Sequence, residues 1–114
     1  MKRNIILIPF LPAAGMALYP FILVKTDRLK LNKTVINHEK IHLRQQLELL
    51  LVPFYVLYLL YYLLNLLYYM KHDKAYRNIV FEREAYIHER DLQYLSRRKF
   101  WAWTRFFSSR FASI

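Results

Sequence analysis

A run of 22 residues without a charged side chain, residues 49–70, places the strongest constraint on what this chain folds into. A stretch of about 20 apolar residues is long enough to cross a bilayer as a helix, so a transmembrane helix is its first interpretation. Interfacial tyrosines gather at the ends of such helices, whereas the six tyrosines here are spread through the run. This spread favours a helix that is partly buried in protein or lies along a membrane surface.

The composition also indicates contact with a membrane. The 114 residues are 56% hydrophobic, carry a formal charge of +10 and include one glycine and no cysteine. The missing cysteines exclude disulfides and thiolate chemistry, and a single glycine excludes a glycine-rich phosphate loop. Apolar content combined with excess Lys and Arg indicates an anionic lipid membrane as a partner. Nucleic acid ranks well below lipid, because the aromatic residues occur in aliphatic runs rather than among the basic residues.

The amino-terminal segment, residues 5–24, is also free of charge and long enough to span a bilayer. Three prolines and the glycine interrupt it, so a clean helix is excluded. We expect a broken or re-entrant helix up to about Leu18, followed by a strand at 21–24. A second short strand at 29–31 would complete a β-hairpin.

A zinc-binding pattern follows in the next helix, which we expect to begin at Val35 after a Thr34 cap and to continue through residue 48. His38 and His42 are four residues apart, so both imidazoles stand on one face of the helix and reach one ion. Glu39 lies between them. This is the HExxH pattern, in which the two histidines bind zinc and the glutamate acts as general base.

Hydrolytic zinc sites have three protein ligands, so one more is needed. Residues 75–99 are expected to form a charged helix that supplies it, and the candidates are Glu82, Glu84, His88, Glu89 and Asp91. A polar connection at 71–74 precedes this helix. The basic and aromatic segment that follows it resembles an interfacial amphipathic helix; packing of its aromatic residues on the core is the alternative.

Glu82-Arg83-Glu84-Ala85 resembles the E-x-x-A motif that follows HExxH in gluzincin zinc peptidases, and residues 38–46 resemble the HExxHxxQ form of small bacterial minigluzincins. The resemblance implies one zinc ion per chain, bound by His38, His42 and Glu82, with Glu39 as the base. Glu82 is preferred to Glu84. Tyr86 stands where the family has an acidic residue.

The resemblance also implies that a peptide or protein substrate lies extended along an edge strand, for which residues 21–25 or 29–31 are the candidates. Gln46 lies one turn beyond His42 and is a candidate for a second layer of contacts around the metal. Tyr86 and His88 are candidates for stabilising the oxyanion.

We therefore expect a single, mainly α-helical, membrane-associated domain, in which the motif helix is antiparallel to the helix that bears the third ligand. Residues 1–33 form the amino-terminal segment, 34–99 the zinc-site helices and 100–114 an interfacial tail. We expect a bacterial location at the inner membrane, integral or monotopic. The expected function is a metallopeptidase; a non-enzymatic basic membrane protein and a catalytically silent zinc adaptor are the alternatives.

The zinc hypothesis demands a particular topology. An unbroken helix from Val35 to residue 70 would be about 54 Å long, which would carry the third ligand away from the histidines. The chain must therefore turn sharply near residues 52–53, or the apolar stretch must lie flat on the membrane. A homodimer that builds each site from two chains is the alternative.

Overall fold

The amino-terminal segment forms a small sheet rather than a helix. In the computed structural model, which describes residues 4–112, strands β1 (Ile5–Leu7), β2 (Gly15–Leu18) and β3 (Phe21–Val24) pair in the order β1-β3-β2. The central strand β3 is parallel to β1 and antiparallel to β2. The predicted strand at 21–24 is confirmed, and the predicted broken helix before it is wrong. Apolar content alone does not separate a short strand from a helical segment.

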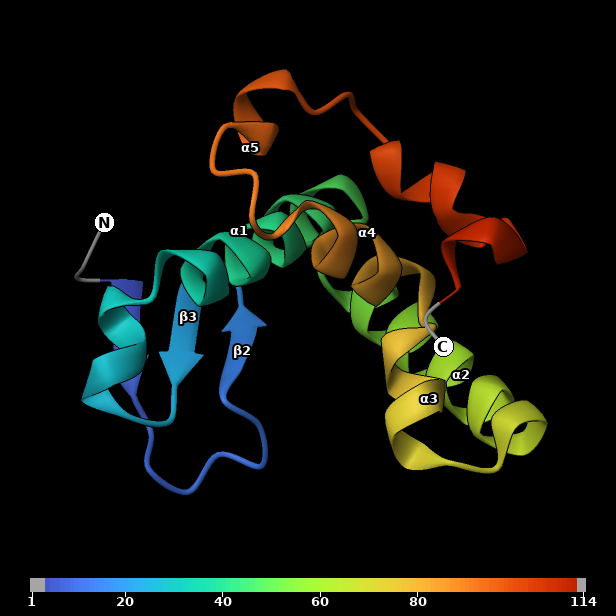
Figure 1. The fold of residues 1–114 in the computed structure, drawn as a ribbon, viewed down its shortest axis with the longest axis horizontal. Helices are drawn as coiled ribbons and strands as arrows, with labels where there is room; N and C mark the ends of the chain where they lie inside the picture. The colour runs from blue at the N-terminus through green and yellow to red at the C-terminus, as the bar shows by residue number, and fades with distance from the viewer. Residues whose placement is uncertain (1–3, 113–114) are drawn as a thin grey trace.

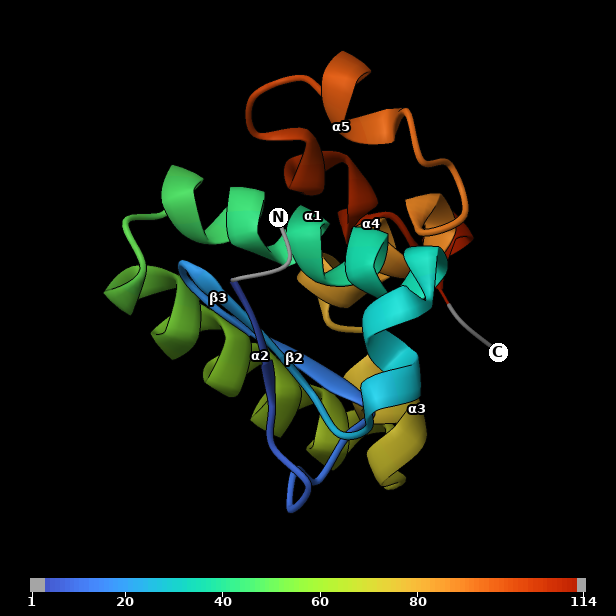
Figure 2. The same cartoon turned by 90° about the vertical axis from the view of Figure 1, so that its left-hand side faces the viewer.

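The predicted hairpin has a different second strand. Residues 29–31 belong to the 3-10 helix η2 (Asp27–Leu31), so the strand predicted there is wrong, and the hairpin is formed by β2 and β3. Ile22 and Val24 of β3 are buried, and helix α1 (Lys33–Glu48) packs across the sheet, as Figure 2 shows.

Helix α1 begins two residues before the predicted start. Asn32, rather than Thr34, is its cap, because the Asn32 side-chain oxygen accepts hydrogen bonds from the amides of Thr34 and Val35, both at 3.1 Å. Asn is as good a capping residue as Thr, since its side-chain oxygen satisfies amides that have no partner within the helix. Thr34 lies in the first turn.

The chain reverses direction between α1 and helix α2 (Val52–Tyr69), close to the predicted position. Leu50 and Leu51 have φ values of 60° and 64°, a left-handed backbone that costs an L-residue other than glycine about 1–2 kcal/mol. Pro53 follows in the first turn of α2, where its missing amide is not needed. By length and composition, α2 alone among the helices of residues 4–112 could cross a membrane.

The predicted helix at 75–99 is three separate helices: α3 (His72–Arg77), α4 (Val80–His88) and α5 (Tyr94–Arg97). The break after α3 lies at Ile79, whose ψ of 135° is extended. Because α3 begins at His72, most of the predicted polar connection is helical. Figure 1 shows α3 doubling back beside α2, with α4 between these helices and α1. The domain is mainly helical with one small sheet, as predicted.

The main core gathers residues from α2, α4 and the carboxyl-terminal 3-10 helix η3 (Ala102–Phe107), which is followed by η4 (Ser109–Phe111). Its buried members are Phe54, Ile79, Val80, Phe81, Trp103 and Phe106. The predicted tail therefore contributes two aromatic residues to the core, and packing on the core was the correct alternative for these. Phe100 and Phe107 stay exposed.

We predict that Leu50→Gly raises the free energy of unfolding by up to about 1 kcal/mol, because glycine adopts a positive φ without strain. The matched control is Leu64→Gly, an exposed leucine inside α2; this change should cost about 1 kcal/mol of helix stability. Thermal unfolding in mild detergent compares the variants. Equal losses for both would show that the turn is not strained.

Candidate metal centre

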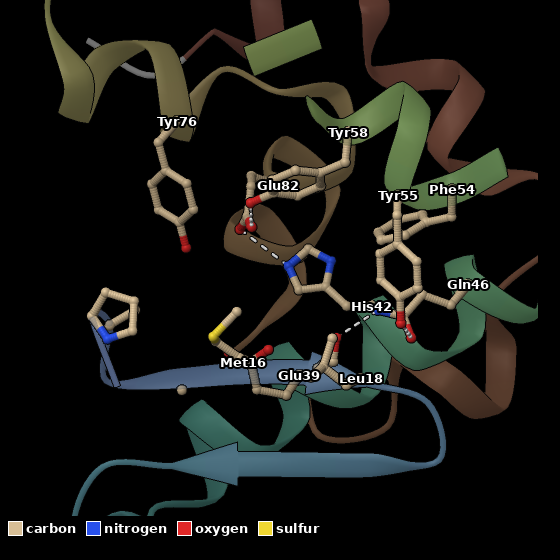
Figure 3. Close-up of a pocket in the computed structure, with 14 residues that line it drawn as sticks. Met16, Leu18, Glu39, His42, Gln46, Phe54, Tyr55, Tyr58, Tyr76 and Glu82 are labelled. Carbon is tan, nitrogen blue, oxygen red and sulfur yellow. Dashed lines mark hydrogen bonds and ion pairs between the residues drawn. The ribbon is translucent and has the colours of Figure 1, made fainter. Parts of the chain in front are cut away.

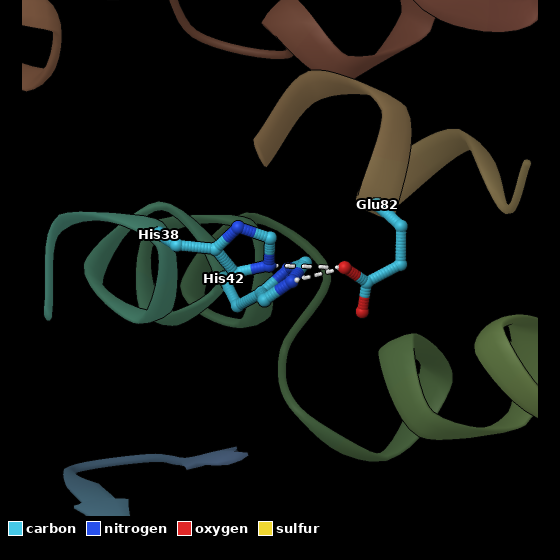
Figure 4. A group of neighbouring side chains, drawn as sticks. All are labelled: His38, His42 and Glu82. Carbon is cyan, nitrogen blue, oxygen red and sulfur yellow. Dashed lines mark hydrogen bonds and ion pairs between the residues drawn. The ribbon is translucent and has the colours of Figure 1, made fainter. Parts of the chain in front are cut away.

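Three buried side chains from two helices meet at one point. His38 and His42 project from α1, and Glu82 faces them from α4 (Figure 4). The Nε2 atoms of His38 and His42 lie 3.0 Å and 3.1 Å from the same carboxylate oxygen, Oε1 of Glu82. One ligand atom from each residue lies within 4.8 Å of the others. The group thus has the donors of a two-histidine, one-carboxylate zinc site.

The Nε2 atom of His42 lies 3.1 Å from Oε1 of Glu82, within ion-pair distance but not in hydrogen-bond geometry. Nδ1 of His42 is 2.8 Å from the side-chain oxygen of Gln45, so Nδ1 carries the proton. In the neutral ring, the lone pair on Nε2 then faces the Glu82 carboxylate, and two acceptors oppose each other. Nε2 is buried and makes no hydrogen bond. A cation between these two acceptors would satisfy both, so the donor set fits a metal ion.

Gln45 is held so that its oxygen faces His42. Its amide nitrogen donates to the carbonyl oxygen of Phe81 at 3.1 Å and to Glu84 Oε1 at 2.8 Å. Glu84 is itself fixed by Arg98 and by the hydroxyl of Tyr94. This chain of contacts sets the tautomer of His42, which is the usual task of the groups surrounding a metal's ligands.

His38 is oriented by Glu89, whose Oε1 lies 2.6 Å from Nδ1. Burial lowers the pKa of His38, but hydrogen bonds to Glu82 and Glu89 outweigh burial and raise the pKa from 6.5 to about 10. Burial by itself raises the pKa of Glu82, yet the two histidines hold that pKa well below its usual range. Without metal, protonated His38 and ionised Glu82 therefore form an ion pair.

Glu39 lies beside the group and lines a cavity of about 230 Å³ (Figure 3). Burial raises the pKa of Glu39, and the charges of His42 and His38 oppose this effect only in part. The chain's one glycine, Gly15 on β2, stands opposite: a Cβ there would lie 3.1 Å from Glu39 Oε2. A side chain at position 15 would therefore push the Glu39 carboxylate by a few tenths of an ångström, so the glycine lets β2 approach the carboxylate undisturbed.

Strand β2 and helix α2 form two walls of this cavity. Phe54, Tyr55 and Tyr58 line it from α2, and residues 15–18 line it from β2. The Tyr58 hydroxyl donates to Glu82 Oε2 at 2.5 Å. Tyr76 of α3 also faces the cavity (Figure 3), and burial raises the pKa of its hydroxyl, which stays protonated as a donor.

The edge strand that lines the cavity is β2, not either of the predicted segments. Strand β3 is paired on both sides, and residues 29–31 are helical, so neither can accept a further strand. Ala17 presents its carbonyl away from β3, because this oxygen accepts from Gln46 Nε2 at 2.7 Å. The backbone groups of one residue point to one side in an antiparallel strand, so Gly15 and Ala17 direct theirs outward.

The other predicted site residues occupy different places. Gln46 lines the cavity but bonds to Ala17, Tyr19 and Tyr55 rather than to a histidine. Tyr86 packs its ring edge-on to His38. The ring of His88 stacks on Tyr94, and neither Tyr86 nor His88 lines the cavity.

Sequence reasoning missed three residues that contact or face the candidate metal group, Gln45, Tyr58 and Tyr76, and gave a fourth, Glu89, a different role. The spacing of Gln45 after His42 is the glutamine position of the HExxHxxQ pattern, so this residue had a signal. Glu89 was considered only as a ligand. The two tyrosines had no local signal, because the folding of α2 and α3 over α4 brings them to the site.

No family model matches this chain, and no similar protein was found among curated sequences or solved structures.

We predict that added zinc raises the melting temperature, and that this increase grows between about pH 6 and about pH 9, because protons compete with metal for His38. In the metal-free protein, protonated His38 contributes stability that is complete below pH 6.5 and is lost as the pH rises through about 10. His42→Gln should abolish the increase. Thermal scans with zinc and with chelator measure it; an increase that does not change with pH would contradict the assignment of His38.

Proposed function

We propose that this chain is a membrane-associated zinc metallopeptidase of the gluzincin type. The observation that carries the proposal is the buried group of His38, His42 and Glu82, with Glu39 next to it and a cavity in front of it. The two Nε2 atoms that converge on one carboxylate oxygen, Oε1 of Glu82, form the donor set of a zinc site, and this convergence supports the proposal.

Zinc bound by this group would lower the pKa of a water molecule to about 7 and polarise the scissile carbonyl. Glu39 takes the proton from the attacking water and delivers it to the leaving amine, because its carboxylate lies next to the ligands and faces the cavity. Burial raises the pKa of Glu39, which makes its carboxylate a stronger base than an exposed glutamate.

The hydroxyl of Tyr76 is the best placed donor for the oxyanion that develops on the attacked carbonyl. It faces the cavity, and the neighbouring hydroxyl of Tyr86 is 3.5 Å away, longer than an ordinary O–H···O hydrogen bond, so the Tyr76 proton can turn toward the cavity. Tyr58 instead uses its proton on Glu82 and holds that ligand. Tyr76 thus takes the role first considered for Tyr86 and His88.

The substrate backbone pairs with the outer edge of β2. Gly15 offers an outward amide and carbonyl along the cavity and Ala17 an outward amide, its carbonyl being bonded to Gln46, and an extended peptide would add to the sheet there. Gln46 fills the end of this edge by bonding to Ala17 and Tyr19. This arrangement passes the peptide directly in front of Glu39.

Membrane attachment rests on α2. Only 6% of the 18 residues of α2 are buried in the protein, and its exposed side chains are mostly apolar. The polar helix α3 lies beside its second half, where Asn65 donates to Ala75 O at 3.1 Å and Tyr62 contacts His72. Charged residues this close to α2 favour a helix lying flat in the interface over one that spans the bilayer.

The catalytic role of Glu39 predicts that Glu39→Gln abolishes peptide hydrolysis while zinc content stays at the wild-type level. A general base contributes about 10²- to 10⁴-fold to the rate. Cleavage of a quenched peptide library by both proteins, purified side by side to exclude a contaminating protease, measures the loss. Equal rates would leave the zinc adaptor or the non-enzymatic protein as the explanation.

The contact between Gly15 and Glu39 predicts that Gly15→Val lowers kcat by about 10- to 100-fold, since displacement of a catalytic group by about 1 Å has effects of this size. Zinc binding should be retained, because the ligands lie on α1 and α4. Ile6→Val, an exposed position on β1 away from the cavity, is the control. Loss of zinc from Gly15→Val would show that the glycine supports the fold rather than the base.

The exposed face of α2 predicts that the protein stays with membranes in high salt and is released by detergent, because apolar burial outweighs the attraction between charges. Fractionation of expressing cells followed by salt and detergent washes measures this. A monodisperse protein in buffer without detergent would contradict membrane attachment.

A further inference from the structure

Helix α2 separates the cavity from an exposed apolar surface. Its inner side supplies Phe54, Tyr55 and Tyr58 to the cavity wall. Its outer side, on the opposite face at helical spacing, consists of Val56, Leu60, Leu63 and Leu67, of which Leu67 is 74% exposed. We call these four residues the outer face of α2. Four exposed apolar side chains in one row on a small domain are typical of a surface that contacts a partner or a membrane.

The mouth of the cavity has an apolar rim on both walls. On the sheet side, Leu18 lines the cavity while remaining 40% exposed, and the neighbouring Tyr19 and Phe21 are exposed as well. On the helix side, Val52 and Leu59 stand about one turn before and after Tyr55, and both are exposed. At helical spacing, the helix side of the rim continues into the outer face of α2, and we call the rim and this face together the apolar border.

Two partners could cover this apolar border: an anionic lipid surface or a second copy of the chain. The net charge of the chain favours the lipid surface. The formal charge of +10 makes two copies repel each other. The same charge attracts anionic lipid, to which each nearby basic side chain adds about 1 kcal/mol. Lys71 follows α2 directly, and Lys74 lies over the ring of Tyr69 at its end.

We infer that the outer face of α2 sits in an anionic lipid surface with the cavity mouth at the lipid boundary, and that the substrate is an apolar peptide segment lying at that surface. This inference rests on the proposed peptidase function. Gln46 bridges Tyr19 and Tyr55 at one end of the cavity, so a segment already held at the interface reaches the cavity between β2 and α2 away from this bridge, without passing through bulk water. Met16, Leu18 and Phe54 offer an apolar lining for its side chains.

The test compares one apolar peptide in two forms, free and carrying a palmitoyl chain, with vesicles of phosphatidylglycerol and phosphatidylethanolamine present in both cases. Binding is measured with zinc-loaded Glu39→Gln, so that the result does not depend on hydrolysis, and cleavage is measured with the wild type. We expect the anchored peptide to be bound and cleaved at least about tenfold better, since sharing a surface raises its effective concentration.

Anchoring would raise the local concentration for any membrane-bound enzyme, so variants of the surface separate the explanations. Leu60→Glu with Leu67→Glu alters the outer face of α2, whereas Leu31→Glu with Leu92→Glu makes the same charge change at exposed leucines outside α2. We expect the first pair to lose the preference for the anchored peptide and vesicle flotation, with cleavage of the free peptide unchanged. The second pair should retain both.

Each outcome has a clear meaning. Preferential binding of the anchored peptide without any cleavage by the wild type would support the lipid-seated outer face with an apolar peptide as its ligand, and would overturn the peptidase and with it the role of that peptide as substrate. Equal use of both peptides, or equal effects of both variant pairs, would overturn the inference and leave the peptidase standing. A stable dimer in place of vesicle binding would show that a second copy covers the face, and would also overturn it.

Discussion

The burial of two imidazoles and two carboxylates at one point is the constraint on which the rest of this structure depends. His38, Glu39, His42 and Glu82 are each no more than 6% exposed. Ionised groups removed from water need opposite charges or a metal to compensate the lost hydration. In so small a domain, this compensation requires α1 and α4 to face each other closely, and the reversal at Leu50 and Leu51 is what permits them to do so.

A second buried charge group supports the first. Arg98 is enclosed between Glu48 and Glu84, with its side chain 1% exposed. Glu84 in turn holds Gln45, which orients His42. Removal of one partner from such a buried pair typically costs 3–5 kcal/mol, so the carboxyl-terminal segment that carries Arg98 is part of the site's framework. Glu84 therefore supports the site through Gln45 and Arg98, and it has this role without being one of the three proposed metal ligands.

The sequence was most informative where one helix carries the whole signal. The spacing of His38 and His42 predicts a shared face directly, and E-x-x-A singled out Glu82, which the structure brings to that face. The strand at 21–24 followed from its β-branched and aromatic residues. These features depend on neighbours within a few positions along the chain.

Features that depend on packing between distant segments could not be predicted in this way. Gly15 faces Glu39 only because the sheet lies against α1, and an uncharged run of residues gives no sign of this. Trp103 and Phe106 resembled interfacial aromatics, yet they fill the gap between α2 and α4. The tyrosines of α2 were noted as unusual, but their contacts with Glu82 and Gln46 follow from the reversal of the chain.

The most direct measurement is the metal content of protein purified without added metal, for wild type, His38→Ala, Glu82→Ala and Glu84→Gln. The account predicts about one zinc ion per wild-type chain, since two histidines and one carboxylate are the usual ligands of a hydrolytic site. His38→Ala and Glu82→Ala should lose this zinc, and Glu84→Gln, which keeps a side chain able to bond to Gln45, should retain it. A wild-type protein without zinc, whose stability is also unchanged by titrated zinc, would contradict the metal centre.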